Sequence, residues 1–139
     1  MSDINMGAIT EALNDKSDRD LRNVDNTAGA DAVIEYQVPT AENGYTWYRK
    51  YKSGWVEQGG HYNGNITAGN GTQIILPIVM ADTHYNISIT AQQRANDWAY
   101  AVVKSDTPTT NYFYVFCGAG SNSDLIIGVY WQVCGMAGE

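Results

Sequence analysis

The chain has 139 residues, a formal net charge of −7 at neutral pH and a charged fraction of only 17%. This length allows one compact domain with a short appendage. The acidity is uneven, because residues 1–42 carry a net −6 and residues 43–139 carry a net −1. A nearly neutral domain without a basic patch offers little to a phosphate backbone, so nucleic-acid binding is not expected. No apolar run approaches the about 20 residues that span a bilayer, and no phosphate-binding loop or other cofactor motif is present.

Residues 1–30 are predicted to form a helical stalk that ends in a linker. Ile9 and Leu13 are four residues apart, and Leu21 and Val24 are three apart, which is the spacing of two short apolar helix stripes. Helices this short are marginal alone in water, so the stripes need partners, either the following domain or further copies of the chain. The alternative is a disordered acidic leader. The first residues lack the positive end and apolar core of a signal peptide, which predicts synthesis in the cytoplasm.

A β-hairpin is predicted from residue 47 to residue 60. Apolar and polar side chains alternate on both sides of Lys52-Ser53-Gly54, and a three-residue loop that ends in glycine fits a type I turn followed by a left-handed residue. In that register an aromatic pair and an opposite-charge pair face each other across the strands, each worth a few tenths to about 1 kcal/mol. The residues that define the hairpin are Trp47, Arg49, Tyr51, Gly54, Trp55 and Glu57, with Tyr51 opposite Trp55 and Arg49 opposite Glu57.

Further strands are predicted at short spacing through residues 31–139, separated by segments rich in Gly, Asn and Pro. Residues 73–80 are almost continuously apolar, which indicates a strand buried on both faces, with Pro77 placing it at an edge or a bulge. Residues 61–72 are predicted to be a long loop or a splayed hairpin tip. About eight strands without a helix favour an antiparallel β-sandwich. The predicted strands outside the hairpin cover residues 32–38, 73–80, 85–91, 98–104, 112–117 and 125–134.

Two stretches carry a resemblance to a known family. The hairpin, Trp47 with Tyr-Arg-Lys-Tyr followed by Gly-Trp-Val-Glu-Gln-Gly-Gly, resembles the hairpin of C-terminal domains in phage and prophage tail fibres. Residues 130–135, Tyr-Trp-Gln-Val-Cys-Gly, are similar to the aromatic strand that closes those domains, and residues 12–26 resemble segments that join a fibre shaft to its tip. The resemblance covers about residues 31–135. It implies a homotrimeric fibre tip of the virion that attaches the particle to a glycan or protein of a bacterial surface.

Loops on a rigid sandwich vary without disturbing the core, so recognition is expected there. An exposed Trp98 beside Asn96 and Asp97 would suit a sugar, with a flat apolar face for stacking and polar groups for its hydroxyls. The alternative is that Trp98 begins a strand and packs inward. The candidate receptor-binding residues are His61, Tyr62, Asn65, Arg94, Asn96, Asp97, Trp98, Ser121, Asn122 and Asp124.

Other chemistry finds little support in the sequence. Cys117 and Cys134 lack metal or redox spacing and are predicted to be reduced, with a disulfide allowed only if their strands belong to different sheets. His84 and Asp82 make only two metal ligands, so no metal site is expected. The acidic residues lie in separate predicted turns, and no catalytic motif is present, so the protein is expected not to be an enzyme. Two rival roles remain, a purely structural fibre terminus and a polysaccharide-degrading tip.

Overall fold

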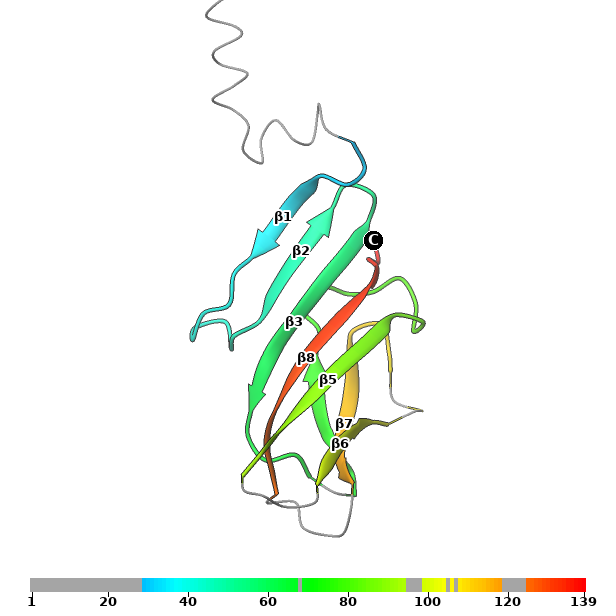
Figure 1. Ribbon diagram of the computed structural model, residues 1–139. Helices are drawn as coiled ribbons and strands as arrows, with labels where there is room; N and C mark the ends of the chain where they lie inside the picture. Colours follow the sequence, from blue (N-terminus) through cyan, green and yellow to red (C-terminus); the bar gives the residue numbers. More distant parts are fainter. Residues whose placement is uncertain (1–28, 68, 95–98, 105, 107, 119–124) are drawn as a thin grey trace, which may run out of the picture.

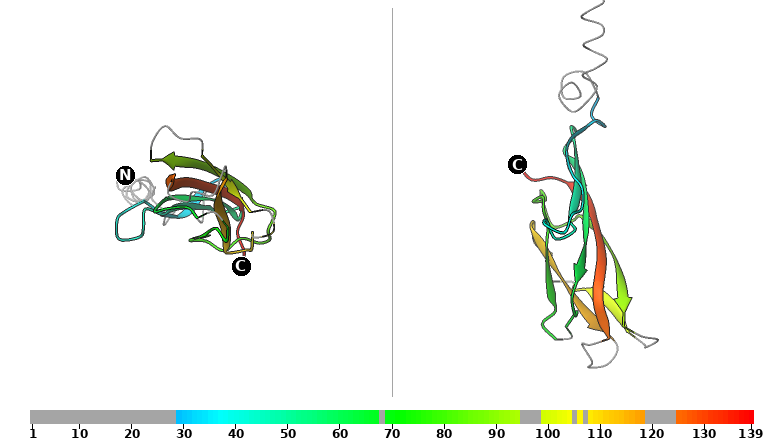
Figure 2. Two further views of the ribbon diagram at one scale, coloured as in Figure 1. Left: turned by 90° about the horizontal axis from the view of Figure 1, so that it is seen from below. Right: turned by 90° about the vertical axis from the view of Figure 1, so that its left-hand side faces the viewer.

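The computed structural model describes residues 29–67, 69–94, 99–104, 106, 108–118 and 125–139. These residues form eight strands and no helix. The strands make two antiparallel sheets that face each other as the layers of a sandwich (Figures 1 and 2). The all-β, eight-stranded sandwich predicted from the sequence is therefore confirmed. In this part of the chain no helix has the length and apolar character needed to cross a membrane.

The larger sheet has the strand order β1-β2-β3-β8-β5, and the smaller sheet has the order β4-β7-β6. The two outermost strands β1 and β2 extend sideways beyond the smaller sheet (Figure 1). The larger sheet consists of β1 Val33–Gln37, β2 Trp47–Tyr51, β3 Trp55–Asn63, β8 Ile126–Met136 and β5 Asn86–Gln93. The smaller sheet consists of β4 Thr72–Ile75, β7 Tyr112–Gly118 and β6 Tyr100–Val103.

The hairpin of β2 and β3 forms in the register that the sequence predicts. Arg49 pairs with Glu57, and Gly54 adopts a φ of 93°, a left-handed conformation that glycine occupies without strain. Arg49 and Glu57, both described residues, form no ion pair within 4.0 Å. The Glu57 carboxylate instead accepts a hydrogen bond of 3.4 Å from the hydroxyl of Tyr51. The register thus comes from the turn and the alternation of side chains and does not require the charge pair.

The core lies between the two sheets and is built from alternate residues of the central strands. Phe113 and Val115 of β7 face Val129 and Val133 of β8, and all four are 0% exposed. The Phe113 ring packs edge-to-face on Trp131, with centroids 6.1 Å apart. Each such side chain contributes roughly 1.5–3 kcal/mol when it is fully buried. The alternation predicted for residues 85–91 is also confirmed, since Ile87 and its neighbours on that face pack against this core.

One buried polar side chain joins the larger sheet to an irregular segment. Gln58 on β3 is 0% exposed, and its amide faces the backbone of Ile78. Gln58 Nε2 donates to the Ile78 carbonyl at 2.9 Å, and the Ile78 N–H donates to Gln58 Oε1 at 2.8 Å. Because Pro77 interrupts the ladder just before, the glutamine replaces the strand partner that this backbone lacks.

Two strand predictions need correction. Residues 73–80 begin in an edge strand, as Pro77 predicted, but they are not one doubly buried strand, because β4 ends at Ile75, which is 65% exposed. Residues 61–63 are not loop, because β3 continues to Asn63 and pairs with β8. β7 and β8 belong to different sheets, which is the arrangement that would have allowed a disulfide. Cys117 and Cys134 nevertheless form no disulfide, and Cys117 is buried in the smaller sheet. The predicted helical stalk falls on residues outside the described part of the chain.

Candidate functional site

Three chain connections meet at one end of the sandwich, which we call the loop end. Gly64 and Ile66, which follow β3, donate backbone hydrogen bonds to Ile127 and Ile126 at 3.0 Å each. Arg94, which follows β5, donates to Leu125 at 3.0 Å. At the opposite end, which we call the entry end, Lys52 and Ser53 donate to Ala32 and Ala30, and Ala137 donates to Gly54. The segment that precedes β1 and the loop end therefore lie at opposite ends of the long axis (Figure 1).

The predicted receptor-binding residues are distributed unequally over this arrangement. Asn65 and Arg94 are exposed at the loop end. His61 and Tyr62 lie within β3, with His61 on the outer face of the larger sheet and Tyr62 against the core. They are thus not loop residues, although they are close to the loop end. The others, Asn96, Asp97, Trp98, Ser121, Asn122 and Asp124, lie outside the described residues.

The outer face of the larger sheet, which turns away from the core, carries a tryptophan that the sequence assigned to the hairpin alone. The six-membered ring of Trp47 occupies the space that a side chain on Gly59 would take. A Cβ on Gly59 would lie 2.7 Å from Trp47 Cζ2 and 2.6 Å from the Trp131 carbonyl oxygen. The next residue, Gly60, accommodates the buried indole of Trp131 on the opposite face, where a Cβ would lie 3.0 Å from Trp131 Nε1. Each glycine of the pair thus makes room for one tryptophan.

Beside Trp47, two rings stack across neighbouring strands of the outer face. His61 of β3 pairs with Tyr130 of β8, and their rings lie 4.2 Å apart with an interplanar angle of 7°. His61 Nε2 also lies 3.1 Å from Oε1 of Gln92, near the C-terminal end of β5. These contacts hold the histidine from two sides, while Tyr130 remains 49% exposed. An aromatic ring is therefore displayed to solvent and kept in one orientation.

Two adjoining hollows on the outer face share Trp47, Gly60 and Tyr130. The first, of about 240 Å³, is completed by polar side chains of β5 and β8 together with the backbone of Trp131. The second, of about 330 Å³, is completed by Pro39, Tyr45 and His61. Together they form what we call the outer groove, whose size is in the range of small-ligand sites, roughly 300–1,000 Å³. The polar side chains of the first hollow are Ser88, Thr90 and Gln132.

Tyr45, at the rim of the outer groove, has an unusual backbone conformation. Its φ is 60°, directly after Gly44 with a φ of 72°, so two left-handed residues follow each other. For a bulky side chain this conformation costs about 1–2 kcal/mol. Tyr45 is also 49% exposed, so burial does not compensate for the strain. Asn43 holds the turn by accepting from the Thr46 N–H at 3.1 Å and donating to the Val38 carbonyl at 2.8 Å.

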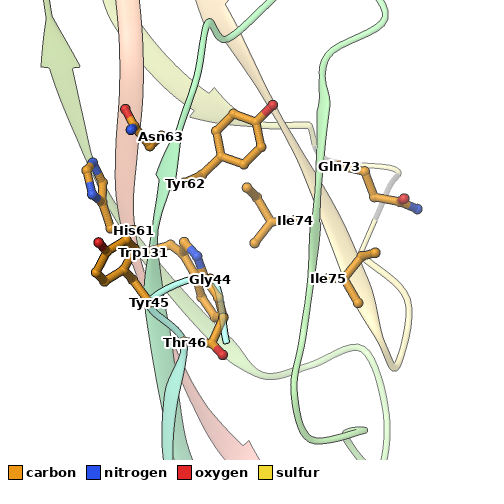
Figure 3. A pocket seen from close by; sticks show the side chains of 10 residues that line it. All are labelled: Gly44, Tyr45, Thr46, His61, Tyr62, Asn63, Gln73, Ile74, Ile75 and Trp131. Atoms are coloured by element: carbon orange, nitrogen blue, oxygen red, sulfur yellow. The ribbon is translucent and has the colours of Figure 1, made fainter. Parts of the chain in front are cut away.

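A larger cleft of about 420 Å³ opens where β3 faces β4. Figure 3 shows Ile74 pointing toward Tyr62 and Trp131, whereas Gln73 and Ile75 point away from them. Trp131 is 5% exposed and Ile74 is 3% exposed, so the cleft exposes little of either side chain. The cleft is thus a gap left between the two sheets, and it does not present a set of accessible polar groups to a ligand.

The outer face of the smaller sheet is more uniformly apolar. Ile75 is 65% exposed and Tyr100 is 54% exposed. Tyr112 and Tyr114 pack edge-to-face, with centroids 5.8 Å apart. Exposed apolar faces of this kind mark contact with another macromolecule. The apolar side chains that this face presents are Ile75, Tyr100, Val102, Tyr112, Tyr114 and Phe116, and Gln73 of β4 lies among them.

Titratable groups suggest neither a metal site nor a catalytic pair. Among the described residues no group of three or more His, Cys, Asp or Glu side chains could hold a metal ion. His84 Nδ1 lies 3.8 Å from Asp82 Oδ1, and both side chains are largely exposed. The Asp82 carboxylate accepts the His84 N–H at 2.8 Å, which makes the pair a local turn. Burial raises the pKa of Tyr85 to about 12, but its hydroxyl donates to the Thr109 carbonyl at 2.7 Å in a structural role.

The fold and the exposed side chains define an antiparallel β-sandwich with a loop end, an outer groove and an apolar face. No protein-family model matches the sequence, and no curated protein matches it. Two solved structures are similar to this chain, and both are parts of an R2 pyocin fibre.

The first of these structures is a C-terminal part of the P. aeruginosa R2 pyocin fibre, with a TM-score of 0.48 and 15% identity over 75% of this chain and 26% of that chain. The second is an N-truncated R2-type pyocin tail fibre, with a TM-score of 0.44 and 15% identity over 75% of this chain and 39% of that chain. The chain thus spans well under half the length of either fibre fragment. At this identity the likeness concerns the arrangement of strands alone.

Proposed function

We propose that this chain forms the tip of a tail fibre of a phage or phage-derived particle and attaches the particle to a bacterial surface. The observation that carries the proposal is the separation of the two ends of the sandwich. The preceding segment joins at the entry end, beside the turn at residues 52–54, while connections after β3, β5 and before β8 converge at the loop end. A domain attached to a shaft at one end presents the other end outward.

We propose further that the domain is a homotrimer, with the apolar outer face of the smaller sheet in the contact between copies. The sandwich also leaves strand edges at β1, β5, β4 and β6, which association can cover. Three sites on one rigid tip multiply avidity without new contacts. Light scattering of the purified chain tests this. A mass three times the protomer's 15.3 kDa is expected, and a protomer mass at micromolar concentration contradicts it.

Attachment is tested by binding labelled protein to whole cells of candidate hosts and counting labelled cells by flow cytometry. Arg94→Glu changes an exposed charge at the loop end, and Lys52→Glu makes the same change at the entry end. Arg94→Glu is expected to weaken cell binding, whereas Lys52→Glu leaves it unchanged. Equal losses, or no binding to any host by the unaltered protein, would contradict attachment through the loop end.

A structural role is the second candidate function, favoured by the apolar face of the smaller sheet. In that role the domain terminates the fibre and keeps its chains in register, and another protein binds the host. Fibres with exchanged loop-end segments separate the two roles, because an unchanged host range favours the structural one. We also propose that the tip is not an enzyme and holds no metal or cofactor. Release of reducing sugar from a surface polysaccharide, abolished by Asp97→Asn or Asp124→Asn, would contradict this.

A further inference from the structure

We propose that the outer groove binds an uncharged pyranose unit of a bacterial surface polysaccharide. The inference rests on the attachment function proposed above, but it locates a contact on strands β2, β3, β5 and β8 rather than on the loop-end connections. It is carried by the rings of Trp47 and Tyr130, by the polar side chains between them and by the strained turn at Tyr45.

The floor of the groove is an aromatic ring whose position depends on a missing side chain. Trp47 lies against Gly59, where any Cβ would come within 2.7 Å of the indole and 2.6 Å of a backbone carbonyl. Because no other residue type fits at position 59 without a shift of the backbone, the indole is held close to the sheet. A large, partly exposed aromatic ring held close to the sheet is the kind of surface on which the apolar face of a sugar ring stacks.

The wall of the groove is Tyr130, which His61 supports from one side. The 4.2 Å stack covers the face of the tyrosine ring that meets His61 and leaves the residue 49% exposed. The His61–Gln92 contact of 3.1 Å fixes the supporting ring in turn. Binding therefore needs little ordering of these side chains, which reduces its entropic penalty.

The polar lining of the groove suits hydroxyl groups and not an ion. Ser88, Thr90 and Gln132 supply two hydroxyls and one amide, which can donate and accept with the hydroxyls of a sugar. The described residues that line the two hollows include no Asp, Glu, Lys or Arg. A phosphate or a carboxylate would find no Lys or Arg side chain there. The chemistry thus favours a neutral sugar over a charged one.

The backbone of Tyr45 indicates that this rim is retained for a reason other than stability. The residue adopts a φ of 60° and stays 49% exposed, so glycine or asparagine would suit the position better. Strain of this kind concentrates at binding sites, where a side chain must be presented in one direction. Tyr45 would contact the sugar from the second hollow.

A second copy of the chain is the competing occupant of this face. The mixture of hydroxyl, amide and aromatic groups in the outer groove contrasts with the smaller sheet, whose outer face presents mostly apolar side chains. Interfaces between permanent partners resemble a core cut in half, which describes the smaller sheet better. The outer groove is therefore assigned to the glycan.

The test is a fluorescence titration of the intact chain with methyl glycosides of glucose, galactose, mannose and N-acetylglucosamine at millimolar concentration. At least one is expected to change the tryptophan emission. Tyr130→Ala is expected to weaken that binding about tenfold or more, the loss typical of an aromatic anchor. Ser88→Arg, a surface change that fills the first hollow without touching the core, has the same expected effect. The control is Val79→Ala, which shortens a similarly exposed apolar side chain outside both sheets and leaves binding unchanged.

Three outcomes overturn the proposal. The first is that none of the four glycosides binds. The second is that a glycoside binds and that Tyr130→Ala and Ser88→Arg both leave its binding intact. The third is that Ser88→Arg changes the light-scattering mass, which would make this face a contact between copies. Cell binding separates this failure from that of the attachment function. If Ser88→Arg still binds whole cells as the unaltered protein does, the groove is not the receptor site but attachment stands. If the unaltered protein binds no cells, attachment itself fails.

Discussion

Replacing Gln58 tests the view that one side chain holds the irregular segment around Pro77 to the larger sheet. The amide makes two hydrogen bonds, of 2.9 and 2.8 Å, to the backbone of Ile78. Gln58→Leu keeps most of the side-chain volume and removes the donor and the acceptor that bind the backbone of Ile78. A buried donor or acceptor left unsatisfied costs about 1–3 kcal/mol. Because Ile78 is only partly buried, we expect the free energy of unfolding to fall by about 2–4 kcal/mol.

The assay is equilibrium unfolding in urea, followed by tryptophan fluorescence, with the free energy taken from linear extrapolation. Gln73→Leu is the matched control, because Gln73 is an exposed glutamine of β4 for which the described residues show no side-chain hydrogen bond. Its expected effect is within about 0.5 kcal/mol. A loss below about 1 kcal/mol in Gln58→Leu would refute the reasoning.

Gln58→Glu adds a pH dependence whose sign follows from the same geometry. A protonated carboxyl can donate to the Ile78 carbonyl and accept from the Ile78 N–H, whereas a carboxylate can only accept. Burial therefore raises the pKa of residue 58 in the folded variant above its unfolded value of about 4.3. The variant should approach the unaltered protein below about pH 4.3 and lose up to about 1.4 kcal/mol per pH unit above it. A difference that stays constant between about pH 4 and 7 would contradict this expectation.

Three further predictions concern single residues. Gly59→Ala is expected to lower the free energy of unfolding by about 1–3 kcal/mol, because its Cβ would lie 2.6 Å from the Trp131 carbonyl oxygen. A thermal unfolding midpoint equal within error to that of the unaltered protein would count against this contact. Tyr45→Gly relieves the left-handed strain and should raise the free energy of unfolding by about 1 kcal/mol while weakening glycoside binding. A stabilised variant that binds glycosides fully would show that Tyr45 does not contact the sugar. Tyr85, whose pKa of about 12 lies above the unfolded value of 10.0, contributes stability that is complete below pH 10.0 and is lost as the pH rises toward 12. In absorbance titration at alkaline pH, Tyr85→Phe should remove one late-ionising tyrosine, and an unchanged titration curve would show that the phenol is not protected.

The sequence predicted the hairpin correctly because the information that determines it is local. The turn requires a left-handed residue at Gly54, and alternation of side chains up to that turn sets the pairing of Arg49 with Glu57. Interactions within about ten residues are enough for both features, and the turn length fixes the register. The same locality made the inward and outward faces of residues 85–91 predictable.

The end of β3 was mispredicted because residues 61–72 are rich in Asn and Gly, which usually mark turns. His61 and Tyr62 were therefore assigned to a loop. In the structure the strand continues, since each glycine leaves room for an indole on one face of the sheet. That role depends on Trp131, a residue distant in the sequence, so no local pattern reveals it. The His61–Tyr130 stack was missed for the same reason.

The order of the strands also lay beyond sequence reasoning. Alternation shows which side chains of a strand point inward, but it does not show which strand lies beside it. The sequence left open whether β7 and β8, which are adjacent in the chain, belong to one sheet or to two. In the structure each completes a different sheet, and Trp131 of β8 meets Phe113 of β7 across the core. Burying the apolar faces of β7 and β8 against each other across the core determines their placement, although the two strands are adjacent in the chain.

The central place of β8 has a consequence for how the protein is made. This strand follows all the others in the chain, yet it pairs with β3 along one side and with β5 along the other. Until β8 leaves the ribosome, β3 and β5 have no common neighbour and both expose open hydrogen-bonding edges. Folding must therefore wait for nearly the whole domain to be translated, and nascent chains are exposed to wrong pairing during that delay. Several chains translated from the same messenger RNA would lie close together, which favours association soon after release.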